Sequence, residues 1–143
     1  MRLYWSVKYL MVVLLMAAAC AQSIVGRLRA NDYALIQEGH YSGSVLIRNG
    51  DVRIEKLVAP WRAALEDEPE LLRGAGAKYF SIPPAVPFHY MYVAEDSAAH
   101  RLILRYFAYE PKPMVIAGWQ LQFVFDERSG KLVGGYAQEL PLE

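Results

Sequence analysis

Apolar and polar side chains alternate along the stretch WQLQFVFD, residues 119–126. The large apolar side chains fall on every second position: Trp119, Leu121, Phe123 and Phe125. Because successive side chains of a β-strand point to opposite faces, this alternation predicts a strand with one face on a core. Burial on one face only is typical of an antiparallel sheet. We therefore expect such a sheet, with this strand at residues 116–125.

Other stretches carry the apolar, β-branched and aromatic residues that favour strands. They are residues 88–94, 101–109 and 131–136, with a shorter strand expected at residues 78–82. Gly134-Gly135 is expected to weaken the last strand or to mark a bulge. In the strand at 88–94, simple alternation puts one set of aromatic residues on one face: Phe88, Tyr90 and Tyr92. The opposite face then carries His89, Met91 and Val93.

A β-hairpin is predicted for the stretch SVLIRNGDVRIE, residues 44–55. Its centre, Asn49-Gly50, favours a two-residue turn whose twist matches that of paired strands. In the register that this turn sets, four apolar side chains share one face: Val45, Ile47, Val52 and Ile54.

A short helix is expected before this hairpin. Asn31 or Asp32 has the side-chain oxygen that caps a first helical turn, and Gly39 is suited to end the helix.

Further helical turns are expected after the hairpin. Pro60 fits the first turn of a helix, with Trp61 and Leu65 on the buried side. Pro69 cannot donate a backbone hydrogen bond within a continuing helix, so it predicts a break or a restart, and Gly74 is expected to end the helical segment. The whole order predicts an α+β domain: an antiparallel sheet of about five to six strands with two or three short helices packed on one face.

The N-terminal residues have the layout of an export signal. Arg2 and Lys8 precede an apolar run from Leu10 to Met16, and small residues follow it. This layout predicts a signal peptide at residues 1–21 and a single α+β domain at residues 22–143. The alternative is a membrane-spanning helix, for which the strongly apolar part is short. We expect an exported protein, periplasmic or extracellular.

Cys20 is the only cysteine, so the chain can form no intramolecular disulfide. Two interpretations compete for its surroundings. Ala19-Cys20-Ala21 matches a signal cleavage site that would discard the cysteine. Ala17-Ala18-Ala19-Cys20 resembles a bacterial lipoprotein box, in which Cys20 is lipidated and tethers the protein to a membrane.

The net charge excludes some partners. The full chain has 15 basic and 15 acidic residues, and removing the predicted signal leaves 13 basic residues and a net charge of −2. Because nucleic-acid binding requires a basic face, no nucleic-acid partner is expected. The sequence also contains no cofactor motif and no closely spaced metal ligands, so we assign no catalytic residue, cofactor or metal.

Aromatic residues are the one compositional excess, and many lie in the predicted strands. Six residues are therefore candidates for a ligand- or partner-binding surface: His89, Tyr90, Tyr92, Tyr106, Tyr109 and Trp119. They predict a non-enzymatic envelope protein that binds a protein partner or a small apolar ligand through an aromatic sheet face or cleft. The alternative is a small exported hydrolase with His89 or His100 as the base, which would need a carboxylate or hydroxyl within hydrogen-bonding reach.

The stretch GWQLQFVFDERSGKLV, residues 118–133, resembles the terminal hairpin of small envelope lipoproteins of the outer-membrane assembly type. The resemblance covers about one tenth of the chain. Two signatures of that group, a Gly-x-Thr helix start and a Leu-Gly-x-Pro motif, are missing from this sequence.

Overall fold

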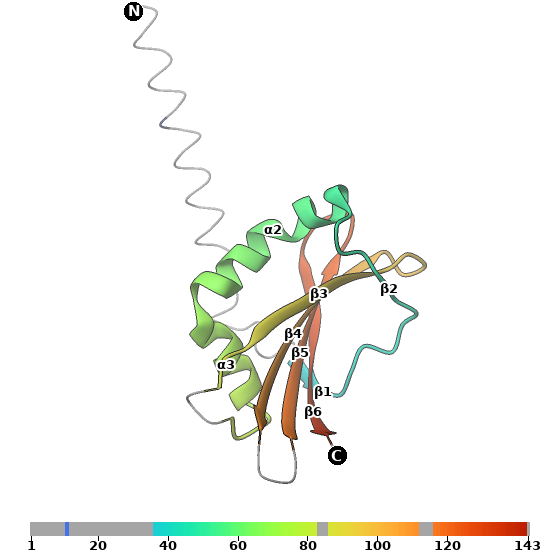
Figure 1. Ribbon diagram of the computed structural model, residues 1–143. Coiled ribbons are helices and arrows are strands. Elements are labelled where there is room, and N and C mark those ends of the chain that lie inside the picture. The colour runs from blue at the N-terminus through green and yellow to red at the C-terminus, as the bar shows by residue number, and fades with distance from the viewer. Residues whose placement is uncertain (1–10, 12–35, 83–85, 112–115, 143) are drawn as a thin grey trace, which may run out of the picture.

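A computed structural model describes residues 36–82, 86–111 and 116–142, together with Met11. Its centre is a six-stranded sheet in the order β1-β6-β5-β4-β3-β2, with both helices on the same side (Figure 1). The strands are β1 (Ile36–Glu38), β2 (Leu46–Ile47), β3 (His89–Asp96), β4 (Arg101–Pro111), β5 (Ile116–Asp126) and β6 (Leu132–Leu142). The helices are α2 (Val52–Asp67) and α3 (Pro69–Ala77). The predicted α+β class is confirmed, with a mostly antiparallel sheet.

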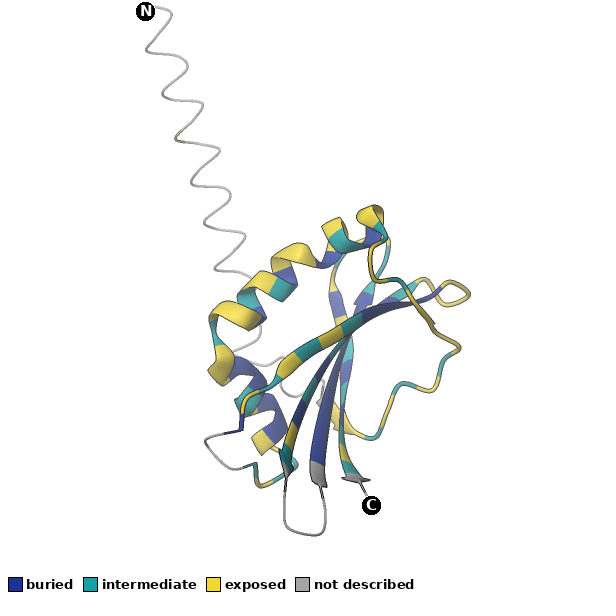
Figure 2. Cartoon of the chain, in the orientation of Figure 1, coloured by how far each residue is buried: buried dark blue, intermediate teal, exposed yellow. Residues whose placement is uncertain are grey.

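The alternating stretch forms β5, in the middle of the antiparallel meander β3–β6. Leu121, Phe123 and Phe125 are buried in one core with the apolar sides of both helices, as the alternation predicts. Figure 2 shows the buried positions on the central strands and on the sides of the helices that face them. One edge departs from the antiparallel pattern, because β1 pairs with β6 in parallel.

The predicted hairpin at residues 44–55 is wrong in its second half. Asp51 is the N-cap of α2, and its carboxylate accepts hydrogen bonds from the backbone N–H groups of Arg53 and Ile54. The physical reason is a competing helical pattern, since Ile54 begins a stripe of buried residues that continues through Val58 to Leu65. Asn49-Gly50 still turns the chain, and Gly50 has a φ of 85°, but the turn leads from β2 into a helix.

The two prolines behave differently. Pro69 occupies the first turn of α3 and marks the predicted restart, which is confirmed. Pro60 lies inside α2, so the predicted helix start there is wrong: the Asp51 cap and the buried stripe place the start two turns earlier. Gly74 does not end α3, which continues to Ala77.

Two shorter predictions are also corrected. Residues 36–38 form β1 rather than the end of a helix, because they pair with residues 135–137 of β6. Residues 78–82 contain turns rather than a strand, and the N–H groups of Tyr79 and Phe80 bond back to the carbonyl of Gly76.

A bulge in β3 changes which side chains share a face. The register shifts between Tyr90, which pairs with Tyr106, and Tyr92, which pairs with Arg105. An extra residue in one strand reverses the alternation beyond it. Tyr90 therefore packs against the helix-side core, whereas Tyr92 packs with the cluster on the other face, and the predicted common face is wrong.

A register shift also occurs in β6. Val124 pairs with Gly134 and Phe125 with Leu132, which leaves Val133 as the extra residue. The predicted bulge therefore lies directly beside Gly134-Gly135.

The face of the sheet away from the helices has its own smaller core. Ala94, Ile103 and Val124 are buried there, and Tyr41 and Tyr136 pack against them. The Tyr41 hydroxyl donates a hydrogen bond of 2.7 Å to Asp96, and its backbone N–H donates to the side chain of Gln122.

The predicted signal peptide, its cleavage site and Cys20 lie outside the described residues, apart from Met11. None of the helices formed by the described residues combines the length and the apolar character needed to cross a lipid bilayer.

Candidate functional site

A pocket of about 240 Å³ opens where α2 gives way to α3, beside the beginning of β3. Its walls come from both helices and from two strands: Leu65, Glu66, Pro69, Leu72, Phe88, His89, Tyr90 and Tyr106. The break between the helices positions the first four of these, because Pro69 starts a new helix two residues after α2 ends.

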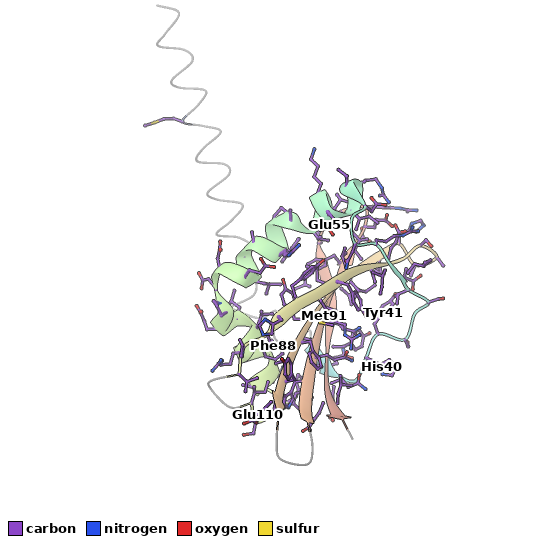
Figure 3. All side chains as sticks on the ribbon, viewed as in Figure 1. His40, Tyr41, Glu55, Phe88, Met91 and Glu110 are labelled. Atoms are coloured by element: carbon purple, nitrogen blue, oxygen red, sulfur yellow. The ribbon has the colours of Figure 1, made fainter. Side chains whose placement is uncertain are left out.

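Phe88 forms the wall beside α3 (Figure 3). Its ring packs on Gly76, where a Cβ atom would lie 3.3 Å from Cζ of Phe88 and 2.7 Å from Cδ1 of Ile82. The absence of a side chain at Gly76 therefore lets the segment that leads into β3 approach α3 closely.

Tyr90 and Tyr106 stand side by side on β3 and β4 and form the sheet side of the pocket. Their ring centroids lie 5.7 Å apart with the planes at 66°, an edge-to-face arrangement. Tyr106 is only 1% exposed. Both hydroxyl oxygens are buried, and neither has a hydrogen-bond partner among the residues that the structure describes.

Charged groups of α2 lie close to the two tyrosines. The Arg62 guanidinium lies over the Tyr90 ring, 3.7 Å from its centroid. Nε of Arg62 donates a hydrogen bond of 2.7 Å to Glu66, and Nη1 lies 3.8 Å from Glu55. The one cation is thus shared between two carboxylates.

These surroundings keep both tyrosines protonated. Burial raises the pKa of the Tyr90 hydroxyl, and the negative charge of Glu55 raises it further. Burial also raises the pKa of Tyr106, with Glu66 as the next cause. At neutral pH each hydroxyl therefore has a proton to donate.

The pocket brings together three of the six candidate residues: His89, Tyr90 and Tyr106. His89 is exposed, and its side chain forms no hydrogen bond with the residues that the structure describes.

The other three candidates lie elsewhere. Tyr92 accepts a hydrogen bond of 3.0 Å from Arg105 on the face away from the helices. On β4, Tyr109 is 51% exposed and stacks on Phe107. Trp119 is buried against Ala108 and Val86 in a small satellite core.

Sequence reasoning missed the contribution of α2. Glu66 belongs to an acidic run that looks like a solvated surface, and Arg62 precedes it by four residues. Residues four apart lie on the same side of a helix, so this spacing is the sequence feature that could have indicated the Arg62–Glu66 pair. The spacing indicates a contact only when residues 52–67 are recognised as one helix.

His100 lies in a separate group of charged residues at the far end of the sheet. Its Nδ1 atom is 4.0 Å from Glu127, beyond hydrogen-bond length, and its Nε2 atom is 3.0 Å from Arg128. Arg53 joins Glu127 to Glu95, which also pairs with Arg48. Across residues 36–82, 86–111 and 116–142, no three His, Cys, Asp or Glu side chains converge as a metal site.

Comparison of the chain with protein-family models, curated proteins and solved structures found no match.

Proposed function

We propose that this chain is an exported, non-enzymatic envelope protein that binds a small, largely apolar ligand in the pocket between α2, α3 and β3. One observation carries the proposal: the pocket wall combines aliphatic and aromatic side chains with two tyrosines whose buried hydroxyls have no hydrogen-bond partner among the described residues. Binding sites for small molecules likewise combine apolar wall residues with a few fixed polar groups.

The volume limits the ligand to a small molecule. A cavity of about 150 Å³ accommodates benzene, and sites for drug-sized ligands begin at about 300 Å³. With about 240 Å³, the pocket suits a substituted single ring or a branched aliphatic molecule of similar size.

Export rests on the basic and apolar pattern of residues 1–21. Mass spectrometry of the N-terminus of protein from the native envelope tests it. Cleavage after Ala21 supports a free protein, a lipidated Cys20 supports a membrane tether, and an intact Met1 contradicts a cleaved signal peptide.

A protein partner is the second candidate. Its support is the aromatic strip on the face of the sheet away from the helices, where Phe107 and Tyr109 stack at 6.0 Å between centroids. Exposed aromatic side chains are common in protein interfaces.

A hydrolase has less support. Neither His89 nor His100 forms a hydrogen bond to a carboxylate or hydroxyl of a described residue, and general-base catalysis needs such a contact in the working state.

Ligand-observed NMR with a set of single-ring and branched aliphatic molecules tests the ligand proposal. Leu72→Phe adds ring volume inside the pocket and should abolish binding, whereas Ala63→Phe on the exposed side of α2 should leave binding unchanged. Equal urea midpoints for the two variants would show that both remain folded. Absence of binding across the set, or binding that survives Leu72→Phe, would contradict the pocket as the site.

A further inference from the structure

The two tyrosine hydroxyls are the feature that packing does not explain. Tyr106 is 1% exposed in a core that otherwise uses apolar side chains such as Phe123, whose ring it meets at 6.1 Å. Phenylalanine would fill the same space without burying an oxygen. Buried polar groups in native proteins almost always have a partner, in the protein or in ordered water, and these two hydroxyls have none among the described residues. Because they lie side by side in one pocket wall, both are available to a partner from outside the chain.

The charged side chains near the tyrosines restrict the charge that such a partner can carry. Arg62 already pairs with Glu66 and lies near Glu55, so two carboxylates surround one cation. An anionic ligand would meet a net negative charge with no cation left to pair with it among these three groups. A neutral ligand avoids this repulsion.

The hydroxyls set the polar chemistry of the ligand. Since both keep their protons at neutral pH, each can donate a hydrogen bond. The hydroxyl oxygens are themselves covered by neighbouring atoms. The Arg62 side chain, whose guanidinium lies over the Tyr90 ring, is long, flexible and about one-third exposed. A ligand would reach the two hydroxyls only after neighbouring side chains move, and Arg62, over the Tyr90 ring, is one that can move toward solvent.

We propose that the ligand is a neutral single-ring molecule with one oxygen acceptor, a ketone, aldehyde or ester, whose oxygen accepts hydrogen bonds from Tyr90 and Tyr106 while the ring contacts Leu72 and Phe88. This proposal depends on the proposed function, because it names the ligand class of the same pocket.

Three probes of similar shape separate the contributions. Acetophenone has the ring and the neutral acceptor, ethylbenzene has the ring without the acceptor, and benzoate has an anionic acceptor. Titration of the full chain by NMR should show acetophenone binding about tenfold more tightly than ethylbenzene, the effect of one to two net hydrogen bonds. Benzoate should bind more weakly than acetophenone.

Conservative variants assign the effect to the hydroxyls. Tyr106→Phe and Tyr90→Phe should each reduce the preference for acetophenone, and the double variant should remove it while ethylbenzene binding stays unchanged. Tyr41→Phe, outside the pocket, should leave the preference intact.

The possible failures are distinguishable. If acetophenone and ethylbenzene bind equally, or if the preference survives in the double variant, the ligand chemistry proposed here is wrong and the pocket remains a binding site. If benzoate binds most tightly, the neutral class is wrong. If no probe binds, both this proposal and the proposed function are overturned.

Discussion

Tyr106 meets the ring of Tyr90 edge-on, with the centroids 5.7 Å apart, and neither hydroxyl has a hydrogen-bond partner in the described part of the chain. The pair closes the sheet side of the pocket. Rings in this arrangement attract one another and contribute to the core. The buried hydroxyls oppose that contribution, so the site combines good apolar packing with unsatisfied polar atoms.

Tyr106→Phe should therefore stabilise the protein. An unsatisfied buried polar group costs about 1–3 kcal/mol, and the substitution removes the oxygen while it keeps the ring. Urea unfolding in ligand-free buffer should show a higher midpoint. A lower midpoint would mean that the hydroxyl is hydrogen-bonded and would remove the main argument for a ligand.

Tyr41→Phe is the matched control and should have the opposite sign. Its hydroxyl donates a 2.7 Å hydrogen bond to the Asp96 carboxylate, so the change should cost about 1.5 kcal/mol of unfolding free energy. A neutral effect would indicate that the contact between residues 41 and 96 contributes nothing in solution.

Asp51→Ala should destabilise α2 by about 1 kcal/mol, since it removes the oxygen that accepts from the N–H groups of Arg53 and Ile54. Asp51→Asn keeps an acceptor of similar quality and should stay close to wild type. Unfolding monitored by far-UV circular dichroism checks both. Equal effects of the two substitutions would argue against the cap.

Gly43→Ala should destabilise the face away from the helices by about 1–3 kcal/mol. A Cβ atom at this position would collide with the carboxylate of Asp96 and would lie 2.8 Å from Cζ of Tyr41. Gly134→Ala is the control, because its Cβ atom would meet no atom within 4 Å. Thermal unfolding of both variants tests the difference, and equal melting temperatures would contradict the predicted crowding.

Stability should fall in acid. The hydrogen bond from the Tyr41 hydroxyl lowers the pKa of Asp96, and the backbone N–H of Ser129 lowers that of Asp126. A carboxyl whose pKa is lowered by folding stabilises the protein above its unfolded pKa, about 3.9 for Asp, and loses that effect as the pH falls through the folded value.

Unfolding free energies between pH 6 and pH 2 should therefore decrease most steeply below about pH 4. Asp126→Asn removes one titrating group and should make the decrease shallower. The same pH dependence in wild type and Asp126→Asn would show that Asp126 does not contribute.

The strands of the meander could be predicted because their signals are local. The alternation from Trp119 to Phe125 depends only on the period of a strand, and that period is visible in the sequence. Asn49-Gly50 correctly predicts a turn, but the strand predicted after it is wrong. The stripe of buried residues that begins at Ile54 makes the following segment a helix.

The pocket depended on features that no local pattern reveals. The bulge in β3 puts Tyr90 on the helix side and Tyr92 on the other, and a bulge is set by how two strands pair. Both tyrosines are aromatic residues of the same predicted strand, and nothing in the local sequence separates them. The four-residue spacing of Arg62 and Glu66 predicts an ion pair only if the helix that contains both residues is predicted correctly.

Two-dimensional NMR of protein with labelled tyrosine rings, titrated with acetophenone, tests the central claim most directly. The account predicts shifts of the Tyr90 and Tyr106 signals that saturate together, with the signals of Tyr92 and Tyr109 unchanged, because only the first pair lines the pocket. Shifts confined to Tyr92 and Tyr109, or no saturable shift at any tyrosine, would contradict it.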